Sequence, residues 1–421
     1  GGGGGPPRPP PPPPPPPPTK GGRLTSANWI DRADRVVMHT YGRQPLVLVR
    51  GEGCRVWDAE GREYLDFVAG LAVCNLGHAH PTVARAASEQ LTRLVHVSNL
   101  YYTTPMVELA EDLVGLSFAD RVFFCNSGTE AVEAAIKLCR RYSQERYGPE
   151  RYRIICMHNS FHGRTLGALS ATGQAKFWQG FGPLLSGFVF VPFNDLSALE
   201  QVMDDTICAV LLEPVQGEGG VNRAEADYLG AVRRLCNQRG VLLVFDEVQC
   251  GLGRTGRLFA YEHFDLTPDV MALAKGLAGG LPMGALLATE EAAQGFVPGS
   301  HASTFGGGPV IAAAARAALG VLSTPDFLAS VRRKGDYVGA KLADLKKRLP
   351  VVEEVRGLGL MWGLQLGQEG LPVVTACRER GLLVNCTQGN VIRLLPPLVV
   401  EKTELDQGLA ILAQALEALG S

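Results

Sequence analysis

The stretch ICAVLLEPVQGEGGVNRAEADYLGAVRRLCNQRGVLLVFDEV, residues 207–248, decides the fold. It begins with the apolar run ICAVLLEP, continues into DYLGAVRRLCNQRG and ends with the apolar run VLLVFDEV. The middle segment has the spacing of an amphipathic helix, and Gly240 is a typical helix stop before a strand over 241–245. A strand, a helix and a second strand in this order predict a parallel α/β unit whose strands are covered on both faces.

The same alternation extends outward from this stretch in both directions. RVFFC (121–125) precedes the helical pattern TEAVEAAIKLCRRY, RIICM (153–157) is another short apolar run, and PVIAAAARAALGVL (309–322) predicts a further helix. Near-continuous apolar strands separated by helices are typical of a mostly parallel sheet. The later segments VVEEVRGLGLMWGLQL and VIRLLPPLVV predict a second, smaller α+β domain.

With 421 residues, the chain is too long for one small core and is expected to form a large and a smaller domain. The glycine- and proline-rich composition of residues 1–23 predicts a disordered tail. Two interpretations of this tail stay open, a ligand for a proline-binding module and a segment without a role in the folded protein. The predicted domains are 24–74 for the N-terminal part of the small domain, 75–318 for the large domain and 319–421 for the C-terminal part of the small domain.

Charge and cysteine usage narrow the classes of partner. The chain has 40 Lys and Arg residues against 42 Asp and Glu residues, so its near-neutral charge predicts no binding of nucleic acid or of an anionic membrane. No uninterrupted apolar stretch reaches about 18 residues, so no membrane span is expected. The 10 cysteines show neither CxxC nor Cys/His spacing, which predicts no metal site and a reduced, cytoplasmic protein.

The first predicted strand end whose residues are suited to bind a ligand follows residues 121–125, where the chain reads NSGT before a helix. Backbone N–H groups at a helix start bind anions, and Gly128 lets the backbone approach a ligand closely. The alternative is an ordinary N-cap by Ser127 or Thr129, with Glu130 in the first turn.

Two further strand ends carry a carboxylate and an amine. Asp246 follows five apolar residues and needs a partner, either a protonated ring nitrogen of a cofactor, a local cap, or a salt bridge to Arg254. Lys275 lies in the apolar, glycine-rich run DVMALAKGLAGGLPMG, where desolvation lowers its pKa and favours the free amine. A free amine reacts with carbonyl compounds, although a lysine that extends to solvent is the simpler interpretation. A phosphate anchor, a carboxylate and an amine together match pyridoxal phosphate (PLP).

A series of motifs then identifies a family. NSGTEAVEAAIKLCRRY, FHGRTLGALSATG, LLEPVQGEGG, VFDEVQCGLGRTG, LAKGL and STFGG, in this order and spacing, resemble class III aminotransferases of PLP fold type I. The resemblance extends from about Thr40 to the last residues. It implies a mostly parallel, seven-stranded large domain with a smaller α+β domain, transaminase activity and a homodimer with shared active sites.

The resemblance also implies which residues hold the cofactor. Lys275 would bind PLP covalently and move a proton, and Asp246 would pair with the ring nitrogen. Thr304 would reach the phosphate in the neighbouring subunit. The other implied cofactor-binding residues are Gly128, Thr129, Phe161, Glu247, Val248 and Gln249.

Substrate recognition follows from the same resemblance. Arg164 and Arg393 match the family's carboxylate-binding arginines, whose planar guanidinium groups suit carboxylates. Glu218 would neutralise Arg393 when a substrate lacks a second carboxylate, so that one pocket serves an ω-amine donor and dicarboxylic 2-oxoglutarate in turn. The weaker candidates for the substrate pocket are Glu213, Tyr41 and Ser303.

Some positions depart from the family or receive no role. Gly308 stands where the family usually has asparagine, which predicts a looser loop around Thr304. His78 and His80 in GHAHP are expected to be structural, and His162 is left without a role. An aminomutase of the same fold and a non-enzymatic PLP-binding protein remain as alternative functions.

Overall fold

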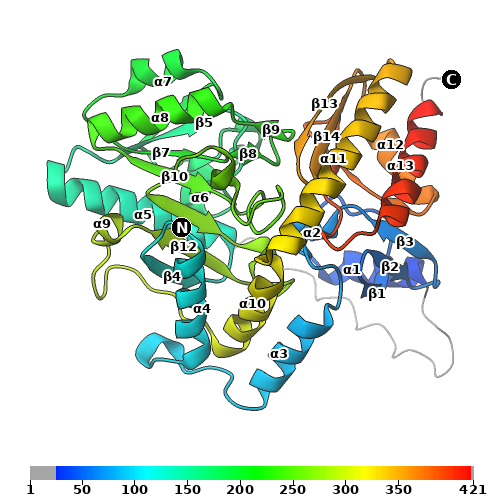
Figure 1. Cartoon of the computed structure of the whole chain (residues 1–421), viewed down its shortest axis with the longest axis horizontal. Helices are drawn as coiled ribbons and strands as arrows, with labels where there is room; N and C mark the ends of the chain where they lie inside the picture. The colour runs from blue at the N-terminus through cyan, green and yellow to red at the C-terminus, as the bar shows by residue number, and fades with distance from the viewer. Residues whose placement is uncertain (1–24, 419–421) are drawn as a thin grey trace, which may run out of the picture. The chain divides into compact units, whose positions relative to one another are not determined.

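A computed structural model describes residues 25–418 of the chain (Figure 1). The predicted tail at 1–23 lies outside these residues. The described chain divides into two compact units, one formed by residues 25–50 and Trp57–Arg62 and the other by Gly51–Val56 and residues 63–418. The domain boundaries predicted at residues 74 and 318 stay predictions.

The first unit is organised around helix α1 (Ser26–Val36). The Glu60 carboxylate accepts hydrogen bonds from the backbone N–H and the hydroxyl of Ser26, both at 2.6 Å, and so fixes the start of this helix. Strand β1 (Leu48–Glu52) begins in this unit, and Glu60 lies in the turn between β2 (Arg55–Asp58) and β3 (Glu63–Asp66).

The second unit contains a seven-stranded sheet that confirms the predicted fold class. In spatial order its strands are β4 (Arg121–Cys125), β12 (Gly284–Ala288), β11 (Val270–Leu273), β10 (Leu242–Asp246), β7 (Ile207–Leu212), β5 (Arg153–Met157) and β6 (Phe188–Val191). Strand β12 runs antiparallel to both of its neighbours, and the remaining pairs are parallel.

Alternate residues of the central strands pack against helices on opposite faces of this sheet. Leu242 and Val244 belong to the core beneath α5 (Gly128–Tyr147), whereas Leu243 and Phe245 pack into the core that includes α8 (Ala226–Arg239). Helix α7 (Leu196–Val202) lies next to α8 (Figure 1). Burial on both faces explains why these strands are apolar at every position rather than at every second one.

Several short elements lie along the connections between the strands. They are α2 (Ala69–Ala72), α3 (Pro81–Leu91), η1 (Ser98–Leu100), α4 (Thr104–Leu116), α6 (Leu166–Ala171), η2 (Ala175–Phe177), β8 (Val215–Gln216), β9 (Asn222–Arg223), η3 (Ala260–His263), η4 (Lys275–Ala278) and α9 (Glu290–Ala293). Helix α10 (Pro309–Leu322) covers the residues predicted for it and begins after Gly308, which supplies no side-chain cap.

The C-terminal part has the predicted α+β character. Helix α11 (Pro325–Arg348) precedes an antiparallel sheet with the order β13 (Val352–Leu358), β14 (Met361–Leu366), β17 (Val391–Leu394) and β16 (Asn385–Thr387). The other elements are α12 (Leu371–Glu379), β15 (Leu382–Leu383), which pairs with β3, and α13 (Lys402–Glu417). Among the described helices, none crosses a membrane by length and hydropathy on its own; α10 and α11 meet that test only when joined across a bend of 66°.

His78, in the GHAHP segment, has a structural partner. Its Nε2 lies 2.8 Å from Oδ2 of Asp66, a carboxylate with 4% exposure. The hydrogen bond to Asp66, together with a hydrogen bond to the Cys74 thiol, raises the pKa of His78 to about 10. The imidazolium is therefore the form that the folded chain stabilises at neutral pH.

Replacing His78 by glutamine is expected to give a pH-dependent loss of stability. The pair stabilises the fold fully below the unfolded pKa of 6.5, and this contribution disappears as the pH rises through about 10. The difference in free energy of unfolding between wild type and H78Q should shrink by about 3 kcal/mol over this range, because a tenfold change in proton affinity corresponds to about 1.4 kcal/mol and water screens part of the pair. Urea unfolding of wild type and H78Q at pH 6 and pH 10 measures this difference in free energy of unfolding. A constant difference would show that the pair does not titrate in this window.

Candidate active site

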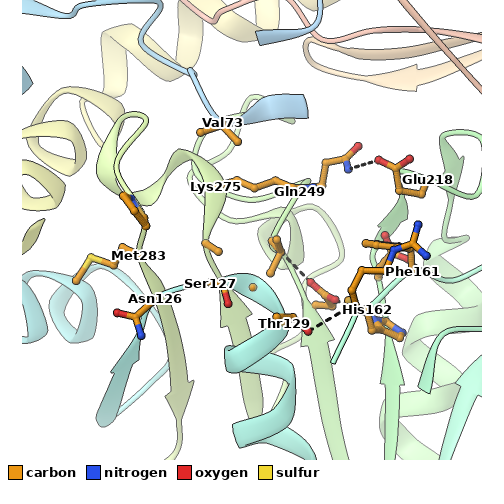
Figure 2. Close-up of a pocket in the computed structure, with 18 of the residues that line it drawn as sticks. Val73, Asn126, Ser127, Thr129, Phe161, His162, Glu218, Gln249, Lys275 and Met283 are labelled. Carbon is orange, nitrogen blue, oxygen red and sulfur yellow. Dashed lines mark hydrogen bonds and ion pairs between the residues drawn. The ribbon is translucent and has the colours of Figure 1, made fainter. Parts of the chain in front are cut away.

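A cavity of about 440 Å³ opens where β4, β11, β10, β7 and β5 end (Figure 2). These five strands run in the same direction, so their carboxyl ends share one edge of the sheet. The residues that line the cavity are Val73, Asn126, Ser127, Gly128, Thr129, Phe161, His162, Gly163, Arg164, Glu213, Glu218, Asp246, Val248, Gln249, Ala274, Lys275, Gly280, Leu281, Pro282 and Met283. Most of the site residues predicted from the sequence are among them.

The N-terminus of α5 forms one wall of the cavity. Ser127 caps this helix by accepting a hydrogen bond from the Glu130 N–H at 3.3 Å, while Gly128 and Thr129 face the cavity. A Cβ atom at Gly128 would lie 2.8 Å from Cγ1 of Val248, so only glycine leaves this backbone open. An ordinary N-cap and an anion-binding helix start therefore coexist here.

Asp246 lies at the end of β10 and is almost fully buried, with 4% exposure. Its Oδ2 is 2.7 Å from Nδ1 of His162, and its Oδ1 accepts a hydrogen bond from the Val248 N–H at 3.0 Å. The alternative salt bridge to Arg254 is not formed, because Arg254 donates instead to Oδ1 of Asn75 and to two backbone carbonyls.

His162, which the sequence left without a role, lines the cavity (Figure 2). It is 2% exposed, and its Nε2 has no hydrogen-bond partner among the described residues. Its position after Phe161 was the only signal in the sequence, since its partner Asp246 lies 84 residues further along the chain.

Lys275 occupies the first position of η4 and has φ of +45°, a left-handed conformation that is strained for a side-chain-bearing residue. Figure 2 shows its side chain in the cavity. Burial lowers the pKa of Lys275, and the opposing charge of Glu218 does not fully offset this. The geometry therefore favours a neutral, nucleophilic amine at this position.

An ion pair lies beside the amine. Nη1 of Arg393 is 2.7 Å from Oε1 of Glu218, and Gln249 bridges the two by donating to Glu218 at 3.2 Å and accepting from Arg393 at 2.9 Å. Arg393 is fully buried, and its Nη2 has no partner within the described chain. Burial alone would raise the pKa of Glu218, but the charge and hydrogen bond of Arg393 lower it and so favour the carboxylate form of Glu218.

Arg164 is exposed at the cavity and lies over aromatic rings. Its guanidinium carbon is 4.1 Å from the ring centroid of Phe177 and 5.5 Å from that of Phe161. Across residues 25–418 its guanidinium has no acidic partner. An arginine held by cation–π contacts without a carboxylate is available to bind one from a ligand.

Glu213 also lines the cavity and supports the backbone at Phe161. It accepts hydrogen bonds from the Phe161 N–H at 2.9 Å and from the Gly217 N–H at 3.1 Å. Burial raises the pKa of Glu213 to about 7, although the nearby His162 opposes this shift. Its carboxyl group orients the backbone that carries Phe161.

Three further predicted residues of the second unit, Glu247, Ser303 and Thr304, are not among those that line the cavity. Glu247 accepts two backbone hydrogen bonds at the start of η3, at 2.5 and 2.7 Å, and has no exposed surface. Ser303 borders the site through a 3.2 Å hydrogen bond from Asn126. Thr304 is exposed beside a separate small cavity, and Tyr41 belongs to the first unit, where it is 74% exposed.

Comparisons with known proteins agree with this arrangement. The model of the family described as aminotransferase class III matches residues 36–416. The chain is 50% identical over 386 residues to the acetylornithine aminotransferase of Caldanaerobacter subterraneus subsp. tengcongensis, covering 91% of this chain and 98% of that protein. It is 45% identical over 396 residues to the succinylornithine transaminase/acetylornithine aminotransferase of Pseudomonas aeruginosa, covering 93% and 98%.

Solved structures give the same result. An ornithine aminotransferase from Toxoplasma gondii, described with partial occupancy of PLP at its active site, superposes with a TM-score of 0.91 and 33% sequence identity over 94% of this chain and 95% of that one. The seven-stranded sheet, the cavity at its carboxyl edge and the family match therefore lead to one conclusion: the chain belongs to the class-III aminotransferases.

Proposed function

We propose that this transaminase uses PLP to transfer the δ-amino group of N2-acetylornithine to 2-oxoglutarate, a cytoplasmic step of arginine synthesis. The observation that carries the proposal is the combination of an unpaired Arg164 with an Arg393 neutralised by Glu218. One carboxylate site is open while the other is reversibly blocked. This arrangement suits a donor with one carboxylate followed by an acceptor with two.

The residues of the cavity fit PLP. The start of α5 offers N–H groups and a positive helix end for a phosphate, and the absent Cβ of Gly128 leaves room for it. The buried Asp246 offers a carboxylate to a protonated ring nitrogen, and Lys275 offers an amine to an aldehyde. Phe161 supplies an aromatic face beside them.

When bound, PLP supplies an electron sink that stabilises negative charge on the reacting carbon. Lys275 Nζ would hold the cofactor and would take up the proton from the carbon that bears the reacting amine. Asp246 holds a proton at the ring nitrogen, and His162 fixes the orientation of Asp246 through the 2.7 Å contact. The apolar walls formed by Val73, Leu281 and others keep water away from these groups.

The two arginines distinguish the substrates. Arg164 binds the carboxylate of N2-acetylornithine while Glu218 keeps Arg393 neutralised. The acetyl group removes the charge of the α-amine and leaves the δ-amine as the reacting group. When 2-oxoglutarate binds, Glu218 releases Arg393, which then takes the second carboxylate.

Glutamate formation from 2-oxoglutarate tests the donor assignment. N2-acetylornithine, succinylornithine, ornithine, succinyl-diaminopimelate and 4-aminobutyrate are compared by kcat/KM with the purified holoenzyme. N2-acetylornithine is expected to exceed ornithine by at least about tenfold, since the charged α-amine of ornithine must be desolvated to enter the cavity, whereas the acetylated amine is neutral. Equal values for all donors, or a lead for another one, would keep the transaminase and overturn this substrate.

The proposed enzyme is a homodimer whose Thr304 reaches the partner's cavity. Support comes from a band of exposed apolar side chains that includes Leu100, Tyr102 and Phe305, which are 81%, 93% and 65% exposed. Asn99 joins the two segments that carry them by donating to the carbonyls of Ser303 and Gly306, both at 3.0 Å. Exposed apolar surface of this kind is typical of a protein interface.

A further inference from the structure

The backbone of Glu218 is held by two neighbouring side chains from the C-terminal sheet. Its carbonyl oxygen accepts hydrogen bonds from Oγ1 of Thr387 at 2.5 Å and from Nε2 of Gln388 at 2.6 Å. Glu218 lies in the sequence GEGG, and the carbonyl of Gly220 accepts a further hydrogen bond from Nε of Arg356 at 2.8 Å. The backbone of this glycine-rich loop is thereby fixed by side chains from other segments.

Gln388 uses both ends of its side-chain amide. Besides Glu218, its Nε2 donates to Oε1 of Gln174 at 2.9 Å, and its Oε1 accepts from Nζ of Lys176 at 3.3 Å. The residue has φ of +54°, a conformation that costs free energy for any residue other than glycine. These contacts stabilise a strained residue at the end of β16, which is a frequent property of positions that serve a function.

Gln174 continues the connection to the other side of the cavity. It is 6% exposed and donates to the carbonyls of Asn159 and Ser160, at 3.2 and 3.1 Å, immediately before Phe161. Lys176 precedes Phe177, the ring on which Arg164 lies. Gln388 is thus bonded on one side to the loop that carries Glu218 and on the other to the segments that support Arg164.

We propose that Gln388 is a positioning residue for substrate specificity, which stabilises the closed Glu218–Arg393 ion pair by holding the Glu218 backbone against the Phe161 and Arg164 side of the cavity. The inference rests on the proposed use of two substrates with one and two carboxylates. The amine donor needs the closed pair, whereas the dicarboxylic acceptor needs it open. Loss of Gln388 therefore penalises the donor and spares the acceptor.

Kinetics of Gln388→Ala test this inference. The donor used is whichever has the highest kcat/KM in wild type, so a wrong donor assignment and a wrong role for Gln388 give different results. In a two-step transfer, kcat/KM of each substrate reports its own half-reaction. We expect the donor value to fall about 5- to 10-fold, the effect expected from loss of the hydrogen bond between Gln388 and the Glu218 carbonyl. The value for 2-oxoglutarate should stay within about twofold.

Further variants separate positioning from general damage. Gln174→Ala should also lower kcat/KM for the donor. The double variant should be no worse than Gln388→Ala, because both single variants break the same contact between Gln388 and Gln174. Gln388→Gly removes the side chain from a backbone that glycine adopts readily, and serves if the alanine variant unfolds. Gln201→Ala on the exposed surface of α7 is the matched control.

Binding of glutarate, measured by calorimetry, provides a readout that does not depend on turnover. Glutarate carries two carboxylates, so its Kd for Gln388→Ala should be equal to or lower than the wild-type value. A parallel loss of kcat/KM for both substrates, weaker glutarate binding, or unchanged donor kinetics would each overturn the proposed role of Gln388.

Discussion

Replacing Lys275 by alanine is expected to reduce kcat by about 10⁴-fold, because Lys275 supplies the base for proton transfer at the reacting carbon. Lys275 is the amine in the described cavity, and burial lowers its pKa towards the neutral form. The measurement is steady-state turnover of the best donor with 2-oxoglutarate.

The matched control is Lys346→Ala on the exposed surface of α11, which should leave kcat unchanged. The K275A chain should unfold at a temperature close to that of wild type, since alanine leaves no unpaired buried charge and the left-handed φ of +45° is strained with either residue. Turnover of K275A within tenfold of wild type would remove Lys275 from the mechanism.

Asp246→Asn is expected to lower kcat by about 10² to 10³-fold, the range found when one preorganised electrostatic contact is removed. Asparagine keeps the size of the side chain and can still accept a hydrogen bond from the Val248 N–H. It cannot supply the negative charge that holds a proton at a ring nitrogen or pairs with His162.

Asp344→Asn on α11 is the control for this variant, because its carboxylate is exposed and pairs with Arg348 on the surface, away from the cavity. Thermal unfolding and turnover are measured together, so that loss of the fold is not mistaken for loss of catalysis. A folded D246N enzyme with wild-type kcat would contradict the role given to Asp246.

Local patterns were sufficient to predict several strands of the seven-stranded sheet and the helices that follow them. The apolar runs at 121–125 and 153–157 coincide with β4 and β5, and the run predicted at 241–245 is displaced by one residue from β10. Helix α10 has the predicted bounds. These elements can be predicted from residues close together in the sequence, because burial on one or both faces sets the spacing of the apolar residues.

Contacts between distant segments could not be predicted in the same way. The partner of Asp246 is His162 rather than Arg254, because the segment after β5 contacts the end of β10 although β7 lies between the two strands, while Arg254 turns towards Asn75. Glu247 follows Asp246 directly, yet it points away from the cavity and supports η3. Along a chain leaving a strand, adjacent side chains face opposite directions, so proximity in sequence does not place both in one site.

The most direct test of the account is the site at which the cofactor is attached. The holoenzyme is reduced with borohydride, digested and analysed by mass spectrometry. We predict that the cofactor mass is retained on a single peptide and maps to Lys275. Attachment at any other lysine, or no retained mass in a holoenzyme that is active, would contradict the assignment of this cavity as the active site.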